Sequence, residues 1–333
     1  MSVTFDVAVI GATGTVGETL VQILEERSFP LGQLHVLASQ ASVAQSVPFK
    51  GRNLRVKAVD GFDFSQVKLA FFCAGEAVSR AYAASASAAG CAVIDLAQGQ
   101  GVPVVVPEVN ADRLGLLQAP FTVGNPGSIA TALALALAPL QPFLTLQQVT
   151  VTACLSMSAA GREAVRELAR QTTELLNARP LEPRVFDRQV AFNMLAQVGA
   201  PDDDGHLSLE KRAHDELREL LELPLLNVAV SCIQAPVFFG DSLSVSLRCT
   251  HPVDLQAVGA ALEQAVGVEW TGKQDYPTAV GDAVGQDELY VGRVRTGLSD
   301  PCELNLWLTL DNVRKGAALN AVQIAELLIK RLS

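Results

Sequence analysis

The chain has 333 residues, of which 49% are hydrophobic and 18% are charged, and its formal net charge at pH 7 is −10. This composition excludes a disordered chain, and the length predicts two domains with buried cores. The acidic balance, without clusters of Lys and Arg, argues against a nucleic-acid partner.

The first 125 residues alternate between strand-like and helix-like segments. The runs "FDVAVIGA", "QLHVLAS", "VKLAFFCA", "CAVIDLA", "VPVVVPEV" and "FTVGN" predict buried parallel strands. The segments "VGETLVQILEER" and "AVSRAYAASASAAG" predict crossover helices. This alternation is typical of a Rossmann-like, doubly wound α/β domain.

A glycine-rich loop, "GATGTVGE", follows the first strand and opens the first helix. Glycines there let backbone amides approach a pyrophosphate at a helix N-terminus, which predicts a dinucleotide site. The expected cofactor-binding residues are Gly11, Thr13, Gly14, Thr15, Val16 and Gly17. The end of the second strand, residues 39–42, carries neither the acid typical of NAD sites nor the Arg typical of NADP sites. NAD and NADP therefore both stay open, and so does the question of whether either is bound.

From about residue 145 the strands become longer and alternate apolar with polar residues, as in "LQQVTVTACL" and "ELNLWLTL". This pattern predicts a second, α+β domain with a mostly antiparallel sheet. Helices are expected over residues 159–177 and 208–221, with an exposed loop at "VGAPDDDGH" between them. The final segment predicts an amphipathic helix with Lys330 and Arg331 in its last turn.

The remaining features give no sign of a metal or a membrane. The longest apolar run, residues 129–140, is shorter than the roughly 18 residues of a spanning helix, and the N-terminus lacks a signal-peptide pattern, so we expect a cytoplasmic protein. The six cysteines are scattered, which predicts reduced thiols without a metal site. Cys154 and Cys232 lie in apolar strands and are expected to be inert rather than a relocated thiolate.

The whole chain resembles the aspartate-semialdehyde dehydrogenase family, and within it the Usg-type paralogues. The matching stretches, in family order, are "GATGTVGE", "AGEAVSRAYAASASAAGCAVIDLA", "VPVVVPEVN", "GNPGSIAT", "SMSAAGREAVREL", "VAFNMLAQV", "APVFFGDSLSV" and "LDNVRKGAALNAVQIAELL". The resemblance implies a Rossmann-like domain of residues 1–127 plus 313–333 and a catalytic-type dimerisation domain of residues 128–312. It also implies a homodimer through the sheet of the second domain.

The family's reaction is the reduction of aspartyl-4-phosphate with NADPH, and it needs a Cys nucleophile, a His base and substrate-binding cations. At the matching positions this chain has Ser128 for the Cys, Asp241 for the His and Gln234 for a substrate Arg. The loop of residues 98–101, which carries a phosphate-binding Arg in the family, has no cation. The other residues that the resemblance assigns are Asn125 and Arg212 toward the substrate and Asn312 and Gln323 toward the cofactor.

Ser128 can be interpreted as a nucleophile or as a helix cap. A serine needs a neighbouring base, and Asp241, with an ordinary pKa of about 3.9, would be a poor one. Ser is also a preferred N-cap residue, so we expect it to cap the helix of residues 129–138.

The leading hypothesis is therefore a family member without the family's activity that retains binding of a nucleotide or a small anion. One alternative is an active NAD(P)-dependent oxidoreductase on another aldehyde or acyl substrate, using direct hydride transfer. Another is an interaction protein that regulates an active paralogue through a mixed dimer.

Overall fold

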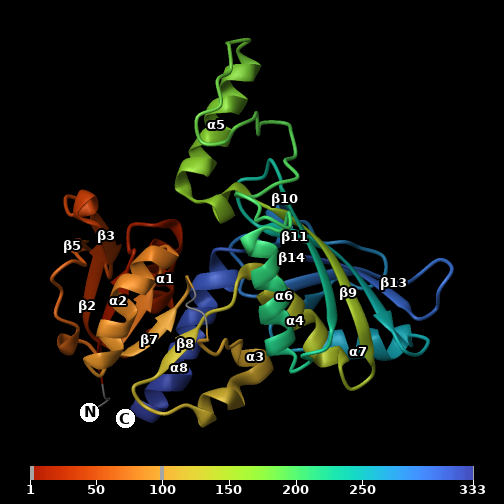
Figure 1. Cartoon of the computed structure of the whole chain (residues 1–333), viewed down its shortest axis with the longest axis horizontal. Coiled ribbons are helices and arrows are strands. Elements are labelled where there is room, and N and C mark those ends of the chain that lie inside the picture. The colour runs from red at the N-terminus through yellow and green to blue at the C-terminus, as the bar shows by residue number, and fades with distance from the viewer. Residues whose placement is uncertain (1–3, 98–100, 333) are drawn as a thin grey trace. The chain divides into compact units, whose positions relative to one another are not determined.

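The computed structural model describes residues 4–97 and 101–332, and the chain divides into two compact units (Figure 1). Unit 1 consists of Met1–Pro126 and Ala317–Ser333, and unit 2 consists of Gly127–Gly316. The chain therefore leaves unit 1 once and returns to it at its C-terminal end.

Unit 1 is built on a six-stranded parallel sheet with the strand order β5-β2-β1-β6-β7-β8. Its strands are β1 (Phe5–Ile10), β2 (Leu31–Ala38), β5 (Lys57–Ala58), β6 (Leu69–Phe72), β7 (Ala92–Asp95) and β8 (Thr122–Gly124). Its α-helices are α1 (Thr15–Glu26), α2 (Glu76–Ala88), α3 (Pro107–Asn110) and α8 (Leu319–Leu332). Short 3-10 helices cover Gln40–Ser42, Phe64–Gln66 and Ala111–Leu116. A separate hairpin pairs β3 (Ser46–Phe49) with β4 (Arg52–Arg55).

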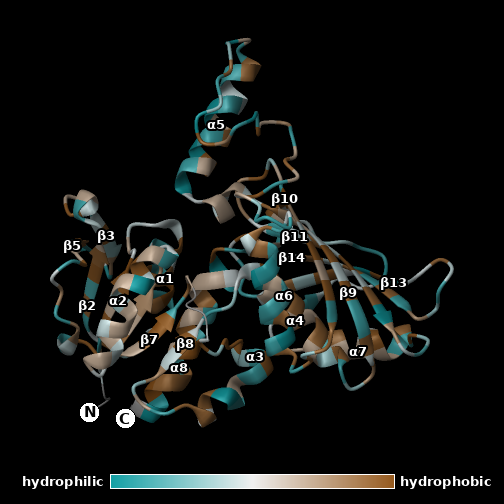
Figure 2. Cartoon of the chain, viewed as in Figure 1, coloured by the Kyte–Doolittle hydropathy of each residue, from teal (hydrophilic) through white to brown (hydrophobic). Residues whose placement is uncertain are grey.

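Helices cover both faces of this sheet, because successive strand residues point to opposite sides. Val7 and Val9 pack in a core with buried residues of α1 and α8. Ala8 and Ile10 pack in a second core that includes residues of α2. In Figure 2, β7 and β8 are coloured largely as hydrophobic, as expected for strands buried on both faces. The predicted doubly wound architecture is confirmed.

The prediction of a strand over "VPVVVPEV" is wrong. Only Val104 pairs with the sheet, through a single bridge to Gly124, and the chain enters α3 at Pro107. Pro103 and Pro107 have no backbone N–H, so this segment cannot form a continuous ladder. Proline is instead favourable in the first turn of a helix.

Unit 2 contains a six-stranded mixed sheet with the order β10-β9-β11-β14-β13-β12. Three of its neighbouring pairs are antiparallel, and the pairs β10/β9 and β12/β13 are parallel. The strands are β9 (Leu146–Leu155), β10 (Asn227–Gln234), β11 (Asp241–Cys249), β12 (Val268–Trp270), β13 (Leu289–Thr296) and β14 (Glu303–Leu310). The α-helices are α4 (Ser128–Leu137), α5 (Arg162–Leu176), α6 (Ser208–Leu220) and α7 (Leu255–Gln264). The 3-10 helices are Ala138–Leu140 and Met157–Ala160, and π-helical turns cover Ala279–Ala283 and Arg314–Ala318.

The second sheet has one buried face and one open face. Val245 and Leu247 of β11 are buried, whereas Ser244 and Arg248 of the same strand are exposed. This alternation of apolar with polar residues is the pattern that the sequence showed. Helix α4 is buried on all sides from Ile129 to Leu137, which agrees with its almost wholly apolar sequence.

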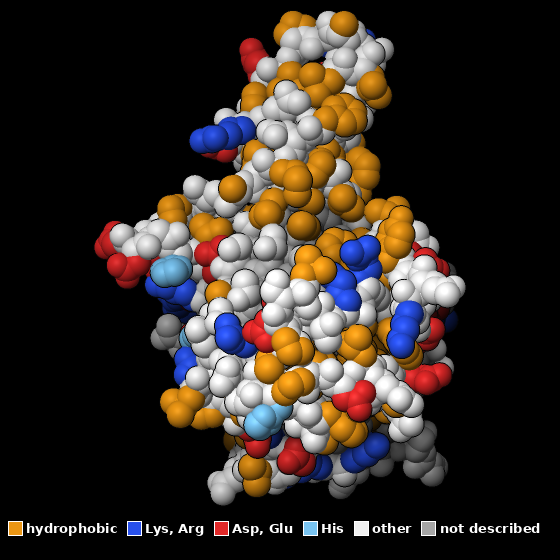
Figure 3. All heavy atoms as spheres, turned by 90° about the vertical axis from the view of Figure 1, so that its right-hand side faces the viewer, with side chains coloured by type: hydrophobic (Ala, Val, Ile, Leu, Met, Phe, Trp, Pro, Cys, Tyr) orange, Lys and Arg blue, Asp and Glu red, His pale blue; other side chains and the backbone are white. Residues whose placement is uncertain are grey.

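Helix α5 and the loop after it, residues 162–200, extend away from the sheet of unit 2 and are called the α5 arm below (Figure 1). Part of the predicted exposed loop lies at its end, and residues 199–206 are all exposed. The arm also exposes hydrophobic side chains, and Figure 3 shows such side chains gathered on the projecting upper part of the surface. They include Leu176, Val185, Phe192 and Met194. Among the described helices, none has both the length and the hydropathy to cross a membrane.

Candidate functional site

The loop between β1 and α1 holds the glycines of the predicted dinucleotide site. Gly11 has a φ of +83°, and a Cβ atom there would lie 2.8 Å from the backbone nitrogen of Ala74. A Cβ atom on Gly17 would overlap the carbonyl oxygen of Gly11, so α1 can approach β1 closely only with glycine there. Gly14 is the N-cap of α1. The glycines thus allow the backbone of the loop to pack tightly at the N-terminus of α1. The positive end of the helix dipole lies there, and a pyrophosphate can bind to it.

A cavity of about 610 Å³ lies beside this loop within unit 1. Thr13 lines it together with Gly11 and Gly14, whereas Val16 packs against the hydrophobic core. Thr15 is the first residue of α1, and its carbonyl oxygen accepts a hydrogen bond from Thr19 Oγ1. The opposite wall comes from residues that follow β2 and β5 and from α2. A volume of this size suits a nucleotide.

Two further predicted residues are held by hydrogen bonds within unit 1. Asn125, buried at the end of β8, accepts a hydrogen bond from Asn320 Nδ2 at 2.8 Å. Gln323 of α8 donates from Nε2 to Glu108 Oε1 at 2.8 Å. Asn320 also donates to the carbonyl oxygen of Val105. Asn125 is therefore positioned by α8, the last element of the chain.

Ser128 and Asp241 are in direct contact within unit 2. The Ser128 hydroxyl donates to Asp241 Oδ2 at 2.9 Å, and the two residues are 113 positions apart in the sequence. Asp241 Oδ1 accepts from the backbone N–H of Ser156 at 3.0 Å and from its hydroxyl at 3.1 Å. Asn312 joins this cluster because its Oδ1 accepts from Ser158 Oγ at 3.0 Å and from the backbone N–H of Gly240 at 3.1 Å.

Asp241 is completely buried. Burial disfavours its charged form and raises its pKa from 3.8 to about 6, and the nearby charge of Asp311 acts in the same direction. Hydrogen bonds from Ser156 and Ser128 to the carboxylate partly offset this effect. Asp241 is therefore a stronger base than an exposed aspartate, and it titrates at about pH 6.

The prediction that Ser128 caps its helix is wrong. Gly127 is the N-cap of α4, no side chain makes a capping hydrogen bond there, and Ser128 is the first residue inside the helix. Its hydroxyl donates to the buried Asp241 carboxylate, because hydrogen bonds to charged acceptors are stronger than those between neutral groups. The backbone N–H of Gly127 is satisfied by Glu216 Oε2 at 2.8 Å instead.

Arg212, the cation that resemblance places toward a phosphate, pairs with an acid of its own helix. Its Nε donates to Glu216 Oε1 at 2.8 Å, four residues along α6. Burial raises the pKa of Glu216, while the charge and hydrogen bonds of Arg212 act against this rise. The guanidinium thus helps to hold a buried carboxylate at the start of α4.

Gln234 is buried at the end of β10, where resemblance places a substrate-binding Arg. Its Nε2 donates to the carbonyl oxygen of Leu155 at 2.9 Å, and its backbone pairs with Leu195. Its Oε1 has no hydrogen-bond partner among the described residues. The side chain is neutral and presents no charge to a substrate carboxylate.

The cysteines near this site are poor nucleophiles. Burial raises the pKa of Cys154, and the charge of Asp241 raises it further. Burial likewise raises the pKa of Cys232 to about 12. A thiolate is therefore rare at either position at neutral pH. Within the described residues, no group of three or more His, Cys, Asp or Glu side chains could hold a metal ion.

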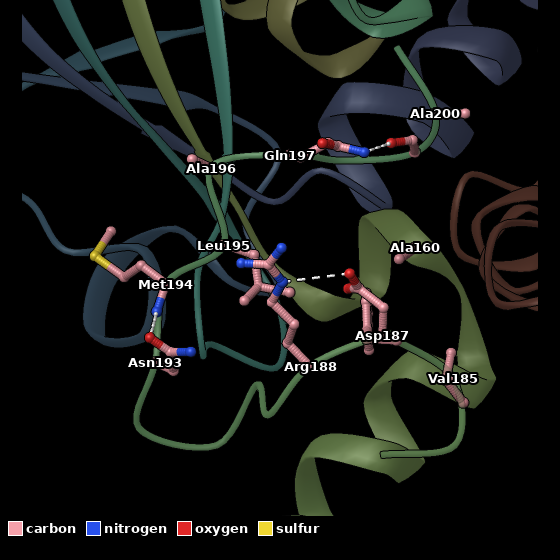
Figure 4. Close-up of a pocket in the computed structure, with 12 residues that line it drawn as sticks. Ala160, Val185, Asp187, Arg188, Asn193, Met194, Leu195, Ala196, Gln197 and Ala200 are labelled. Atoms are coloured by element: carbon pink, nitrogen blue, oxygen red, sulfur yellow. Dashed lines mark hydrogen bonds and ion pairs between the residues drawn. The ribbon is translucent and has the colours of Figure 1, made fainter.

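A larger cavity of about 870 Å³ lies in the α5 arm (Figure 4). Ala160 and Val185 line one side, and Met194 and Ala196 lie across from them. Its ionisable groups do not converge on a ligand position, because Arg188 pairs with its neighbour Asp187 at 3.3 Å and both are exposed. The cavity thus lacks the convergent polar groups of a catalytic site.

Sequence reasoning missed several residues of these sites. Ser156 and Ser158 follow β9 in "LSMS", and only the fold brings Ser156 to Asp241 and Ser158 to Asn312. The sequence analysis did not single out Glu216, which is buried, although its spacing of four residues from Arg212 could have signalled an ion pair. Asp60, which lines the nucleotide cavity, follows a strand of only two residues. Of the loop 98–101, only Gly101 is among the described residues.

Comparison with known proteins identifies the family. Residues 6–116 match the model "Semialdehyde dehydrogenase, NAD binding domain", and residues 137–315 match "Semialdehyde dehydrogenase, dimerisation domain". The "USG-1 protein homolog" of Azotobacter vinelandii is 58% identical over 334 aligned residues, which cover 99% of each chain. The chain belongs to the aspartate-semialdehyde dehydrogenase family.

Solved structures of the family agree with this assignment. A probable aspartate-semialdehyde dehydrogenase from Pseudomonas aeruginosa is 57% identical, with a TM-score of 0.97 over 99% of this chain and 100% of that one. Aspartate semialdehyde dehydrogenase II from Vibrio cholerae, complexed with ASA, is 40% identical, with a TM-score of 0.95 over 99% of each chain. Family membership thus rests on sequence and fold together.

Most of the site residues described above fall within one or the other of the two matched regions. The NAD binding domain match contains the glycine loop and Asp60, and the dimerisation domain match contains Asp241, Arg212 and Asn312. Ser128 lies between the two matched regions.

Proposed function

We propose that this protein is a nucleotide-binding member of the aspartate-semialdehyde dehydrogenase family that does not catalyse the family's reaction through a covalent acyl-enzyme. The observation that carries the proposal is the contact between Ser128 Oγ and the buried Asp241 carboxylate. By resemblance, these residues stand at the positions of the nucleophile and the base.

The contact favours a structural role over acyl transfer. A serine hydroxyl attacks only if its base can take the proton, and a carboxylate with a pKa of about 6 remains far weaker than the alkoxide that it would have to generate. Asp241 also accepts two hydrogen bonds from Ser156, which stabilise the carboxylate and weaken it as a base. Gln234, buried and neutral, supplies no charge for an anionic substrate.

Nucleotide binding is supported by unit 1. A Cβ atom at Gly11 would clash with the backbone of Cys73 and Ala74, and one at Gly17 would clash with the carbonyl oxygen of Gly11, so the close approach of this loop needs both glycines. The adjoining cavity also has a suitable volume. Gly11, Thr13 and Gly14 would hold the pyrophosphate, with the amides at the start of α1. A bound nicotinamide nucleotide would supply hydride chemistry to any reaction here.

The proposal is tested by two measurements on the purified full-length chain. Calorimetric titration with NADH, NAD, NADPH and NADP should show binding tighter than about 100 μM for at least one of them, which corresponds to about −5.5 kcal/mol. Phosphate-dependent oxidation of aspartate semialdehyde should show no turnover, with an active family enzyme as positive control. The proposal that no acyl-enzyme forms would be contradicted by turnover that Ser128→Ala abolishes. It would also be contradicted by a covalent acyl adduct on Ser128, detected by mass spectrometry.

A second candidate function is a direct hydride transfer to a carbonyl substrate, without a covalent intermediate. The raised pKa of Asp241 favours this candidate, because a carboxyl group whose pKa is closer to the working pH is better suited to proton transfer. Ser128 Oγ would give a proton to the carbonyl oxygen, and Asp241 would resupply it. NAD(P)H oxidation on a panel of aldehydes, lost in both Ser128→Ala and Asp241→Asn, would establish this candidate.

We further propose that the protein is a cytoplasmic homodimer. The dimerisation domain match supports self-association, and the open face of the second sheet offers a surface for it. A mixed dimer with an active paralogue is the alternative, and native mass spectrometry of the two proteins together distinguishes the assemblies.

A further inference from the structure

The nucleotide cavity of unit 1 has a charge pattern that bears on which dinucleotide it takes. Its wall opposite the glycine loop is formed by Ser39, Gln40 and Ser42, which follow β2, and by Asp60, which follows β5. None of the described residues that line the cavity is Lys or Arg, and Asp60 is the one acid among them.

The sheet topology explains why Asp60 reaches this cavity. Strand β5 pairs in parallel with β2, with Ala58 opposite Ala38, so the two strands end at the same edge of the sheet. The backbone N–H of Val59 donates to the carbonyl oxygen of Ala38 at 2.9 Å and holds the two strand ends together. Asp60 therefore leaves the sheet at the same edge as Ser39 and Gln40, and all three line the cavity.

This position is one strand away from the usual location of the ribose-binding acid. NAD sites of this fold carry an Asp or Glu at the end of the second strand, where it accepts hydrogen bonds from the ribose hydroxyls. Here that strand is followed by Ser39 and Gln40, and the acid comes from the neighbouring edge strand. The Asp60 carboxylate is exposed and has no hydrogen-bond or ion-pair partner in the part of the chain that the structure describes.

From this arrangement we infer that the cavity selects NAD(H) over NADP(H), with Asp60 as the residue that determines the choice. The inference rests on the proposed nucleotide binding. The carboxylate accepts hydrogen bonds from the hydroxyls of the adenosine ribose, and such charge-assisted bonds are strong. A 2′-phosphate has close to two negative charges at neutral pH, and Asp60 repels it.

The other features of the cavity do not reverse this preference. The glycine loop and the start of α1 act on the pyrophosphate, which both dinucleotides share. Ser39, Gln40 and Ser42 are neutral donors that could contact a phosphate but cannot neutralise its charge. Lys57, the basic residue nearest to Asp60 in the sequence, does not line the cavity.

The test is the ratio of two dissociation constants, measured by fluorescence titration of the full-length chain with NADH and with NADPH. We expect the wild type to bind NADH at least about tenfold more tightly, which corresponds to about 1.4 kcal/mol. Asp60→Asn should weaken NADH binding, strengthen NADPH binding and bring the ratio close to one. Ser42→Arg should strengthen NADPH binding, and its effect on NADH binding should be smaller.

Asp112→Asn is the matched control, because it removes the same charge from an exposed residue of unit 1 that does not line the cavity. It should leave the ratio unchanged. Equal affinities in the wild type, tighter NADPH binding, or an equal loss of both ligands in Asp60→Asn would overturn the inference while nucleotide binding itself stands. If neither dinucleotide binds, the proposed function fails and the inference falls with it.

Discussion

The Asp241 carboxylate bears on both the proposed chemistry and the stability of unit 2. It is fully buried, and its partners Ser128, Ser156 and, through the neighbouring serines, Asn312 are polar but uncharged. Hydrogen bonds from neutral groups compensate only in part for the loss of water around a buried charge. The ionised form of Asp241 therefore costs free energy at neutral pH.

We predict that Asp241→Asn stabilises the protein at neutral pH. In the unfolded chain this carboxyl ionises near 3.8, and in the folded chain near 6. Between these pH values the folded state binds more protons, so its free energy of unfolding falls as the pH rises from about 4 to about 6. The penalty at pH 7.5 is about 3 kcal/mol, since a pKa difference of one corresponds to about 1.4 kcal/mol. Asn keeps the acceptor for Ser156 and can donate to Ser128 Oγ.

Urea unfolding of wild type and variant at pH 4 and pH 7.5 measures this effect. The advantage of Asp241→Asn should be larger at pH 7.5 than at pH 4 by about 2.5 kcal/mol, because a small part of the penalty is already present at pH 4. Asp203→Asn, which removes the same charge from an exposed loop, should show no such pH dependence. A variant that is less stable than wild type by the same amount at both pH values would refute the prediction.

At the scale of elements, the α5 arm is held together by a network of polar side chains rather than by a large core. Gln171 is buried, and its Oε1 accepts hydrogen bonds from the backbone N–H groups of Val190 and Ala191 at 2.8 and 3.2 Å. Its Nε2 donates to Glu167 Oε1 at 2.7 Å. One side chain of α5 thereby satisfies two buried backbone donors of the returning loop.

Gln171→Ala should loosen this loop. Each unsatisfied buried donor costs about 1–3 kcal/mol. The free energy of opening the loop should therefore fall by roughly 2 kcal/mol or more. Hydrogen exchange at the amides of Val190 and Ala191 reports this opening. Thr173→Ala, on the exposed side of the same helix, should change the exchange rates little. Unchanged protection of these amides from exchange in Gln171→Ala would show that hydrophobic packing, for example between Leu168 and Val190, is sufficient to hold the loop.

Elements with a clear period could be predicted from the sequence, and contacts between distant residues could not. The alternation of β9 and β14 predicted these strands, and the helix predicted over residues 208–221 matches α6 within a few residues. The hairpin β3/β4 was missed because its turn is Lys50-Gly51, with both φ angles positive, where Asn-Gly is the usual signal.

The same limit explains the candidate site. The glycine loop is local, so its spacing and its place after β1 were sufficient to predict it. The role of Ser128 depends on Asp241, which the sheet of unit 2 brings near from 113 positions away. Local propensity favoured Ser128 as a helix cap, but in the structure its hydroxyl donates a long-range hydrogen bond to Asp241 instead.

At the scale of the whole molecule, the open face of the second sheet is the feature that bears on assembly. Ser244 of β11 and Thr152 of β9 lie opposite each other and away from the buried face. Along β9 and β11 this face carries mainly polar side chains, several of them exposed. The resemblance to the family predicts that two copies associate through this face.

We predict a homodimer whose stability depends on this face. Sedimentation of the wild type should give twice the mass of the chain, and Ser244→Arg should shift it toward monomer, because two copies of the Arg would be brought close together across a twofold interface. Gln264→Arg, exposed on α7, adds the same charge away from the sheet and should leave the dimer intact. A dimer equally stable in both variants would place the interface elsewhere.

The return of the chain to unit 1 affects how the protein can fold during translation. Helix α8 belongs to the core that contains Val7 and Val9, yet it is synthesised after all of unit 2. Until then one face of the parallel sheet lacks part of its cover, while unit 2, a single continuous segment, is already complete. During translation the apolar core of unit 1 is therefore completed late, and Asn125 receives its hydrogen bond from Asn320 only after the whole of unit 2 has been synthesised.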